Sequence, residues 1–182
     1  MTDLNRRLVL ALLGAGIARV HLEAAAGALA RWQPSPGPYQ PTFFTADEHR
    51  LLEALSECII PTTPRSPGAR AARVAEFIDL VVAHGPGATQ DDWRTQLAAF
   101  DATCTRTAGG PFATLDEAAR RRVLDAVSAR ERALDGDDVR AFARVKQATI
   151  DAYYTSEIGL RQELGYLGPQ MLATFPGCQR QA

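Results

Sequence analysis

The chain has 182 residues, a hydrophobic fraction of 46% and a formal net charge of −1. This length and composition are typical of one globular domain, and the near-neutral charge argues against a nucleic-acid partner. Three cysteines are too few for a disulfide framework, although an odd number leaves at least one thiol unpaired in an oxidising compartment.

The first 30 residues have the features of an export signal. Arg6 and Arg7 precede a moderately apolar run that is about half as long as the roughly 20 residues needed to span a bilayer. Small residues at positions 24–30 then offer cleavage sites. We therefore predict a twin-arginine signal over residues 1–30 and a periplasmic location, with a buried first helix of a cytoplasmic protein as the alternative.

Prolines recur through residues 31–43, which excludes a helix and predicts an extended linker to a body at residues 44–182. The body begins with a predicted helix, for which Thr45 and Glu48 form a capping box. Pro61 ends this helix. A second helix is predicted after the turn at Pro67-Gly68, and its apolar positions follow steps of three and four: Val74, Phe77, Ile78, Val81 and Val82.

Three more helices follow in the same pattern. Thr89 is predicted to cap the third, which carries Trp93, Leu97, Phe100 and Cys104 on one face. Thr114 and Glu117 form the predicted capping box of the fourth, whose core side is Ala119, Val123, Ala126 and Val127. The fifth runs from about Val139 to Tyr154. Since no stretch alternates with period two, we predict an all-α, compact bundle of about five helices with an irregular C-terminal tail.

Histidines and cysteines, which can act as metal ligands, are scattered along the sequence. His21, His49 and His84 have no second histidine or cysteine three or four residues away, so no metal site is predicted. Cys58 and Cys104 have apolar neighbours and are predicted to be buried thiols. Cys178 follows a Pro-Gly turn and is a candidate for an intermolecular or long-range disulfide, with a free or internally paired thiol as the alternative.

The last third of the chain carries aromatic and turn residues that a helical core does not need. Aromatic side chains are favoured at protein interfaces, because they bury a large area at a modest entropic cost. Glu157, beside the paired tyrosines, either orients a partner loop or binds an ion, or it has a capping and turn role within this chain. The residues predicted to form a partner interface are Tyr153, Tyr154, Thr155, Ser156, Glu157, Gly159, Tyr166, Phe175, Pro176, Gly177 and Cys178.

These segments together resemble the gluconate 2-dehydrogenase subunit 3 family. The most specific part is the run from Tyr153 to Gly159, followed by Leu164-Gly165-Tyr166. Supporting segments are Phe44-Thr45-x-x-Glu48, Ile59-Ile60-Pro61-Thr62, Pro67-Gly68-Ala69 and Val74-x-x-Phe77-Ile78-Asp79.

The resemblance implies a small subunit with no cofactor and no catalytic residue of its own. Its partner would be a large FAD-containing subunit of the glucose-methanol-choline oxidoreductase type that oxidises sugars or sugar acids, and a cytochrome c would accept the electrons. The small subunit would stabilise this partner and, through its signal, take it folded through the twin-arginine translocon. The segment from Phe175 to Cys178 is similar to members linked to glycoside 3-oxidation, but only Gln179–Ala182 follow it here, so the substrate class stays open.

Two other functions fit the same residues. One is a stand-alone helical enzyme that uses Glu157 and Tyr153 or Tyr154 as acid and base. The other is a helical regulatory module, against which the near-neutral charge argues where the target is a nucleic acid.

Overall fold

The structure is a computed structural model of the chain that describes residues 39–166 and residue 168. The predicted signal with Arg6 and Arg7, most of the predicted linker, and the segment from Phe175 to Cys178 lie outside the described residues. The described residues form helices and turns without any strand, which confirms the all-α prediction.

The helical elements are, in chain order, α3 (Ala46–Ile59), α4 (Gly68–Ala71), α5 (Val74–Ala83), α6 (Gly87–Ala108), η1 (Phe112–Thr114), α7 (Glu117–Ser128), η2 (Glu131–Ala133), α8 (Asp137–Tyr154) and η3 (Ile158–Glu163). The five predicted helices correspond to α3, α5, α6, α7 and α8. The short helix α4, the 3-10 turns η1 and η2, and the π-helical turn η3 were not predicted from the sequence. Among the described helices, none has both the length and the hydropathy needed to cross a membrane.

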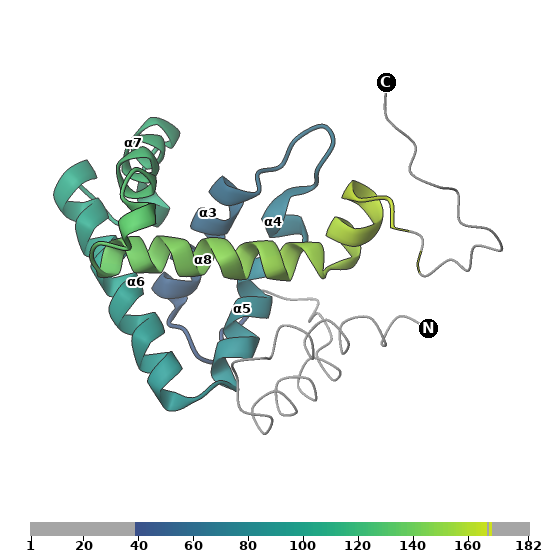
Figure 1. Cartoon of the computed structure of the whole chain (residues 1–182), viewed down its shortest axis with the longest axis horizontal. Helices are drawn as coiled ribbons and strands as arrows, with labels where there is room; N and C mark the ends of the chain where they lie inside the picture. Colours follow the sequence, from purple (N-terminus) through teal and green to yellow (C-terminus); the bar gives the residue numbers. More distant parts are fainter. Residues whose placement is uncertain (1–38, 167, 169–182) are drawn as a thin grey trace.

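Helix α8 runs through the middle of the bundle and contacts α3, α5, α6 and α7 (Figure 1). The buried residues on one face of α8 follow steps of three and four: Val139, Phe142, Val145, Thr149 and Tyr153. Among them, the apolar side chains of Val139, Phe142 and Val145 each contribute roughly 1.5–3 kcal/mol by leaving water. The loop after α3 and the turn η3 lie together at the carboxyl end of α8 (Figure 1).

The predicted start of α3 is confirmed in atomic detail. The Glu48 N–H donates to Thr45 Oγ1 at 3.3 Å, and the Thr45 N–H donates to the Glu48 carboxylate at 2.8 Å. This reciprocal capping box satisfies two backbone donors that the first turn of a helix leaves unpaired.

The predicted start of α6 was wrong. The helix begins at Gly87, with Pro86 in an extended conformation before it and no side-chain cap, and Thr89 lies within the first turn. Pro86 is the N-cap residue, whose ring fixes φ, and the helix begins directly after it. The predicted buried face of α6 is confirmed, since Trp93, Leu97, Phe100 and Cys104 are all buried.

The predicted capping box of α7 was also wrong. Thr114 lies in η1, where its hydroxyl donates to the carbonyl of Pro111 at 2.8 Å. Asp116 caps α7 instead, and its carboxylate accepts from the Ala119 N–H at 2.7 Å. Ala126, predicted to face the core, is exposed, because the buried positions of α7 are Ala119, Val123 and Val127, at steps of four.

Asp79 on α5 holds the segment that enters the bundle. This carboxylate is fully buried and accepts hydrogen bonds from the Tyr39 hydroxyl at 2.8 Å and from three consecutive backbone N–H groups, those of Thr42, Phe43 and Phe44, at 2.6–3.0 Å. Burial and this bond to Asp79 raise the pKa of Tyr39. The last residues of the predicted linker, from Tyr39 onward, therefore contact the body.

Candidate protein interface

Two segments that are far apart in the sequence meet at the carboxyl end of α8. The Ser66 hydroxyl, in the loop between α3 and α4, lies 2.7 Å from the hydroxyl of Tyr153. Tyr153 donates its own proton to Glu163, at the end of η3, at 2.7 Å. Because Tyr153 has a side chain that is 0% exposed, these bonds satisfy a polar group that would be costly to bury alone.

The carboxylate of Glu163 accepts a hydrogen bond from a second tyrosine hydroxyl. Tyr154 donates to its other carboxylate oxygen at 2.9 Å, and the rings of Tyr153 and Tyr154 meet edge to face at 5.1 Å. The hydrogen bonds from Tyr153, Ser66 and Tyr154 lower the pKa of the Glu163 carboxyl. The same carboxylate raises the pKa of Tyr154, and burial together with Glu163 raises the pKa of Tyr153.

The segment between Tyr153 and η3 reverses the chain in a compact turn. The buried Ser156 hydroxyl donates to the Tyr153 carbonyl at 2.6 Å and accepts from the Gly159 N–H at 3.0 Å. A Cβ on Gly159 would lie 2.2 Å from the Tyr153 carbonyl oxygen, so only glycine fits there. The turn then widens into a π-helix, in which the Leu164 N–H donates to the Gly159 carbonyl at 3.1 Å.

The loop between α3 and α4 is equally constrained. The Thr62 N–H and hydroxyl both donate to the carboxylate of Glu57, at 2.9 and 2.7 Å. Burial raises the pKa of Glu57, but the hydrogen bonds from Thr62 and from the Arg70 N–H outweigh it, and the net pKa lies below its usual value. Gly68 closes the loop at φ +81°, where a Cβ would lie 2.5 Å from the Thr62 hydroxyl.

These two constrained segments present an exposed surface. Leu164 and Tyr166 are 58% and 43% exposed, and residues 61–65 of the loop are all exposed. We call residues 61–65 together with residues 161–166 the η3 face. Elsewhere in the described chain, Leu134 beside η2 is the other large apolar side chain that is exposed.

The predicted interface residues fall into four groups. Tyr153, Ser156 and Gly159 are buried, so any effect they have on a partner passes through the shape of the η3 face. Tyr154 and Thr155 are half-buried. Glu157 and Tyr166 are exposed, as a direct contact requires, while the four residues from Phe175 to Cys178 lie outside the described region.

The structure does not bring Glu157 together with Tyr153 or Tyr154, the acid and base of the alternative stand-alone enzyme. Both tyrosine hydroxyls donate to Glu163, whereas Glu157 pairs with Arg161 at 3.3 Å on the surface. Sequence reasoning did not identify Ser66 or Glu163. Ser66 is in a loop without periodicity, and Glu163 follows the tyrosines at spacings of ten and nine that match no helical face.

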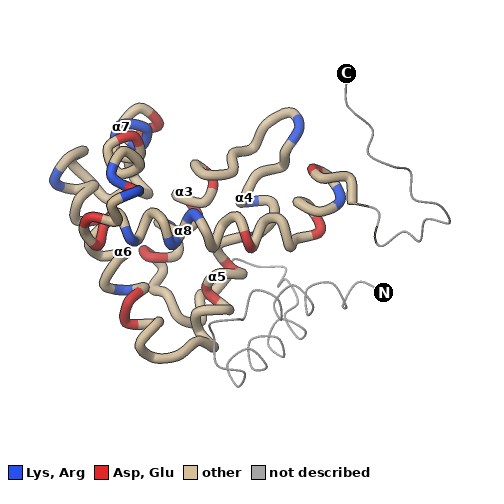
Figure 2. The backbone as a smooth tube through the Cα atoms, viewed as in Figure 1, with Lys and Arg blue, Asp and Glu red and all other residues tan. Residues whose placement is uncertain are grey.

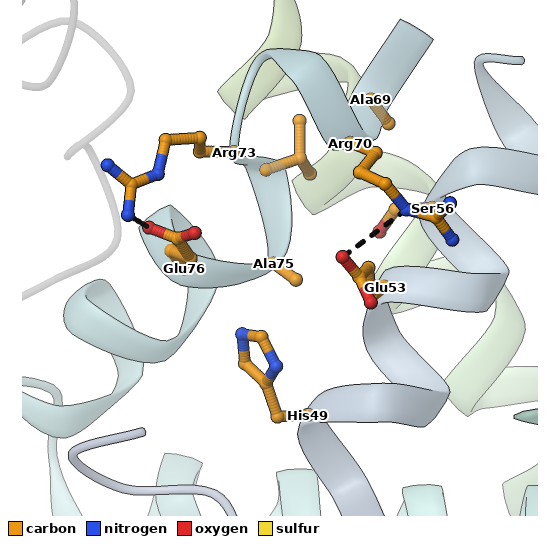
Figure 3. Close-up of a pocket in the computed structure, with 9 residues that line it drawn as sticks. His49, Glu53, Ser56, Ala69, Arg70, Arg73, Ala75 and Glu76 are labelled. Carbon is orange, nitrogen blue, oxygen red and sulfur yellow. Dashed lines mark ion pairs between the residues drawn. The ribbon is translucent and has the colours of Figure 1, made fainter. Parts of the chain in front are cut away.

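Two hollows lie elsewhere in the described structure. A cavity of about 20 Å³ lies between α3, α4 and α5, where His49 points between Glu53 and Glu76 (Figure 3). Arg70 and Arg73 pair with these carboxylates at 3.3 and 2.5 Å. This space holds about one water molecule and is too small for an organic substrate.

The second hollow is a groove of about 280 Å³ between α3, α6 and η1, with an apolar floor that includes Leu51 and Leu97. Its volume lies just below the roughly 300–1,000 Å³ of pockets for drug-sized ligands. Within the described chain, no group of three or more His, Cys, Asp or Glu residues could hold a metal ion. Basic and acidic residues are interspersed along the described backbone (Figure 2).

The two cysteines that the structure describes are free thiols. Burial raises the pKa of Cys104 to about 12, and it also raises the pKa of the half-buried Cys58. Both therefore resist ionisation, as expected for thiols among apolar neighbours.

No curated protein and no solved structure matches this chain. A family model does match it, over residues 46–172, which span all described helices and both segments of the η3 face. On that match, which covers more than half of the chain, the chain belongs to the gluconate 2-dehydrogenase subunit 3 family.

Proposed function

We propose that the chain is a non-catalytic small subunit that binds and stabilises the FAD-containing catalytic subunit of a sugar or glycoside dehydrogenase. Family membership supports this proposal, because a subunit 3 of a dehydrogenase is by its name one part of a larger complex. The expected partner is a large subunit of the glucose-methanol-choline oxidoreductase type. In this proposal FAD and the catalytic groups belong to that partner.

The observation that carries the proposal is the exposure of Leu164 and Tyr166 on a rigid support. A hydrogen-bond network joins Ser66, the buried Tyr153 and Glu163, and it holds the turn from which these two side chains project. Interface energy concentrates in a few aromatic, arginine and well-packed apolar residues, and rigid presentation lowers the entropy cost of binding. The η3 face thus has the composition and the stiffness of a protein-binding surface.

Co-expression with the catalytic subunit tests this proposal. The catalytic subunit carries the affinity tag, and the amount of this chain that co-purifies and the FAD absorbance of the soluble complex are measured. We expect Leu164→Asp to reduce co-purification by at least about tenfold, as for an interface hot spot. Leu134→Asp is the matched control, because Leu134 is similarly exposed but lies beside η2, outside the η3 face.

Two results would contradict the proposal. If the catalytic subunit is soluble, FAD-loaded and fully active without this chain, the stabilising role is wrong. If Leu134→Asp and Leu164→Asp reduce co-purification equally, the partner does not bind the η3 face.

Export is the second part of the proposed function. Arg6 and Arg7 would direct the folded complex to the twin-arginine translocon and the periplasm, where the complex could associate with the membrane and pass electrons to a cytochrome c subunit. Replacing both arginines with lysine should retain both subunits in the cytoplasm, as measured by fractionation. Unchanged periplasmic activity would favour the cytoplasmic alternative and overturn this part.

The substrate and the tail are the remaining parts. We propose a substrate of the glucoside 3-dehydrogenase or gluconate 2-dehydrogenase type. Assays of the purified complex with methyl glucoside and with gluconate distinguish these two substrate types.

Cys178 is proposed to form a disulfide with the catalytic subunit, and a non-reducing gel of the complex reveals this disulfide as a cross-linked band. A band pattern that does not change on reduction would show that this disulfide is absent.

A further inference from the structure

A single arginine on the η3 face is presented without a partner. In the loop between α3 and α4, Thr63 and Ser66 exchange backbone hydrogen bonds, at 2.7 Å from the Thr63 N–H and 3.2 Å from the Ser66 N–H. These bonds close a two-residue turn with Pro64 and Arg65 at its tip. The outer end of the loop projects from the bundle and is basic (Figure 2). Within the described chain, the guanidinium of Arg65 makes no hydrogen bond or ion pair.

The turn that carries Arg65 is held at several points. The Thr63 hydroxyl accepts from the N–H groups of Arg65 and Ser66, at 3.3 and 3.0 Å. The Ser66 hydroxyl bonds to Tyr153, and Thr62 is bonded to Glu57. The backbone of Arg65 is therefore ordered before any partner arrives, and a contact made by its side chain loses less entropy than one made from a mobile loop.

Other charges on this face already have partners. The Glu163 carboxylate accepts both tyrosine hydroxyls, and Arg161 pairs with Glu157. Since Ser66 bonds to the same tyrosine as Glu163, the loop tip lies beside the turn that carries the exposed Leu164 and Tyr166. Arg65 is thus an unmatched positive charge next to an exposed apolar pair.

We infer that Arg65 is a specificity-determining contact of the η3 face, which binds a partner surface that offers an apolar recess for Leu164 and Tyr166 and a carboxylate for Arg65. A planar guanidinium binds a carboxylate through two parallel hydrogen bonds, which fixes orientation as well as adding affinity. The inference rests on the proposed function, because the partner is taken to be the catalytic subunit. It adds a residue outside the predicted interface and the chemistry that this residue requires opposite it.

The test measures the dissociation constant between the full chain and its catalytic subunit at about 50, 150 and 500 mM NaCl, a range over which screening of charges becomes strong. We expect Arg65→Gln to weaken binding roughly tenfold at low salt and Arg65→Glu to weaken it more, by roughly a hundredfold. Arg65→Lys should recover only part of the loss, because an ammonium lacks the bidentate geometry. Arg65→Gln should also reduce the salt dependence of binding.

Arg121→Glu is the matched control, since Arg121 is exposed on α7, away from the η3 face. All four variants should keep the wild-type Tm, because neither side chain is buried. If the wild-type chain binds and Arg65→Glu binds equally well, the charge inference is wrong while the proposed function stands. If Arg121→Glu weakens binding as much as Arg65→Glu, the effect is one of net charge, and the inference is also wrong. If the wild-type chain does not bind the catalytic subunit at any salt concentration, both proposals fail.

Discussion

The hydroxyl of Tyr153 lies 2.7 Å from that of Ser66, although 87 positions separate the two residues. This contact joins the last turn of α8 to the loop after α3, and Glu163 joins η3 to the same tyrosine. These two contacts bring the segment at residues 59–62 and the segment at residues 153–159 to the same end of the bundle.

Tyr153→Phe tests this contact directly. The ring would keep its packing, but Ser66 and Glu163 would each lose a hydrogen-bonding partner. We expect the free energy of unfolding to fall by about 1–2 kcal/mol, the usual net value for such bonds, as measured by urea denaturation. The control is Tyr166→Phe, whose ring is exposed, and equal stability of the two variants would show that the buried hydroxyl contributes nothing.

Gly159→Ala should be far more destabilising than an ordinary glycine substitution. The added Cβ would lie 2.2 Å from the Tyr153 carbonyl oxygen and 3.1 Å from its ring, both within the rigid turn. Overpacking of this kind costs about 3 kcal/mol. At Gly87 an added Cβ meets nothing within 4 Å, so Gly87→Ala should leave Tm unchanged or slightly raised. A Gly159→Ala protein with the Tm of wild type would mean that the turn rearranges freely.

Asp79→Asn should loosen the segment that enters the bundle. The variant replaces one carboxylate oxygen by an NH₂ group, which cannot accept from the N–H groups that now converge on it. Loss of a charge-assisted acceptor with buried donors left unpaired is expected to cost about 2–4 kcal/mol. Hydrogen exchange should quicken at the amides of Thr42 to Phe44. The control is Asp91→Asn on the exposed side of α6, and protection of these amides equal to wild type would refute the assignment.

Glu163 makes stability depend on pH on the acid side. Its pKa in the folded chain lies below the ordinary value of 4.5, because the hydrogen bonds from Tyr153, Ser66 and Tyr154 favour the carboxylate. The contribution of this group is therefore complete above about pH 4.5 and is lost as the pH falls through the folded-state pKa.

We accordingly expect Glu163→Gln to have a lower Tm than wild type at about pH 7, and this difference to shrink as the pH falls below about 4.5. The side chain is exposed, so the effect should be modest and should weaken in salt. A difference in Tm that stays constant from neutral to acid pH would show that the charge of Glu163 is not involved. Exposed Glu117→Gln on α7 serves as the control.

The local patterns of the sequence predicted most helices correctly, because burial along a helix repeats every three or four residues. Trp93, Leu97, Phe100 and Cys104 all face the core as that spacing predicts, and the capping box at Thr45 is confirmed. Predictions failed where two local signals competed. A threonine that is able to cap a helix lies three residues before Glu117, yet Asp116 is the residue that caps α7.

The sequence by itself therefore determined the helical class, most helix positions and the family, since each depends on residues close together in the chain. Only the tertiary structure decided that Tyr153, Ser156 and Gly159 lie inside the turn while Leu164 and Tyr166 lie outside it. It also decided that Ser66 meets Tyr153 and that Asp79 holds the segment at Thr42 to Phe44. Hydrogen bonds between residues 35 to 87 positions apart leave no period in the sequence, because their geometry exists only once the helices have packed.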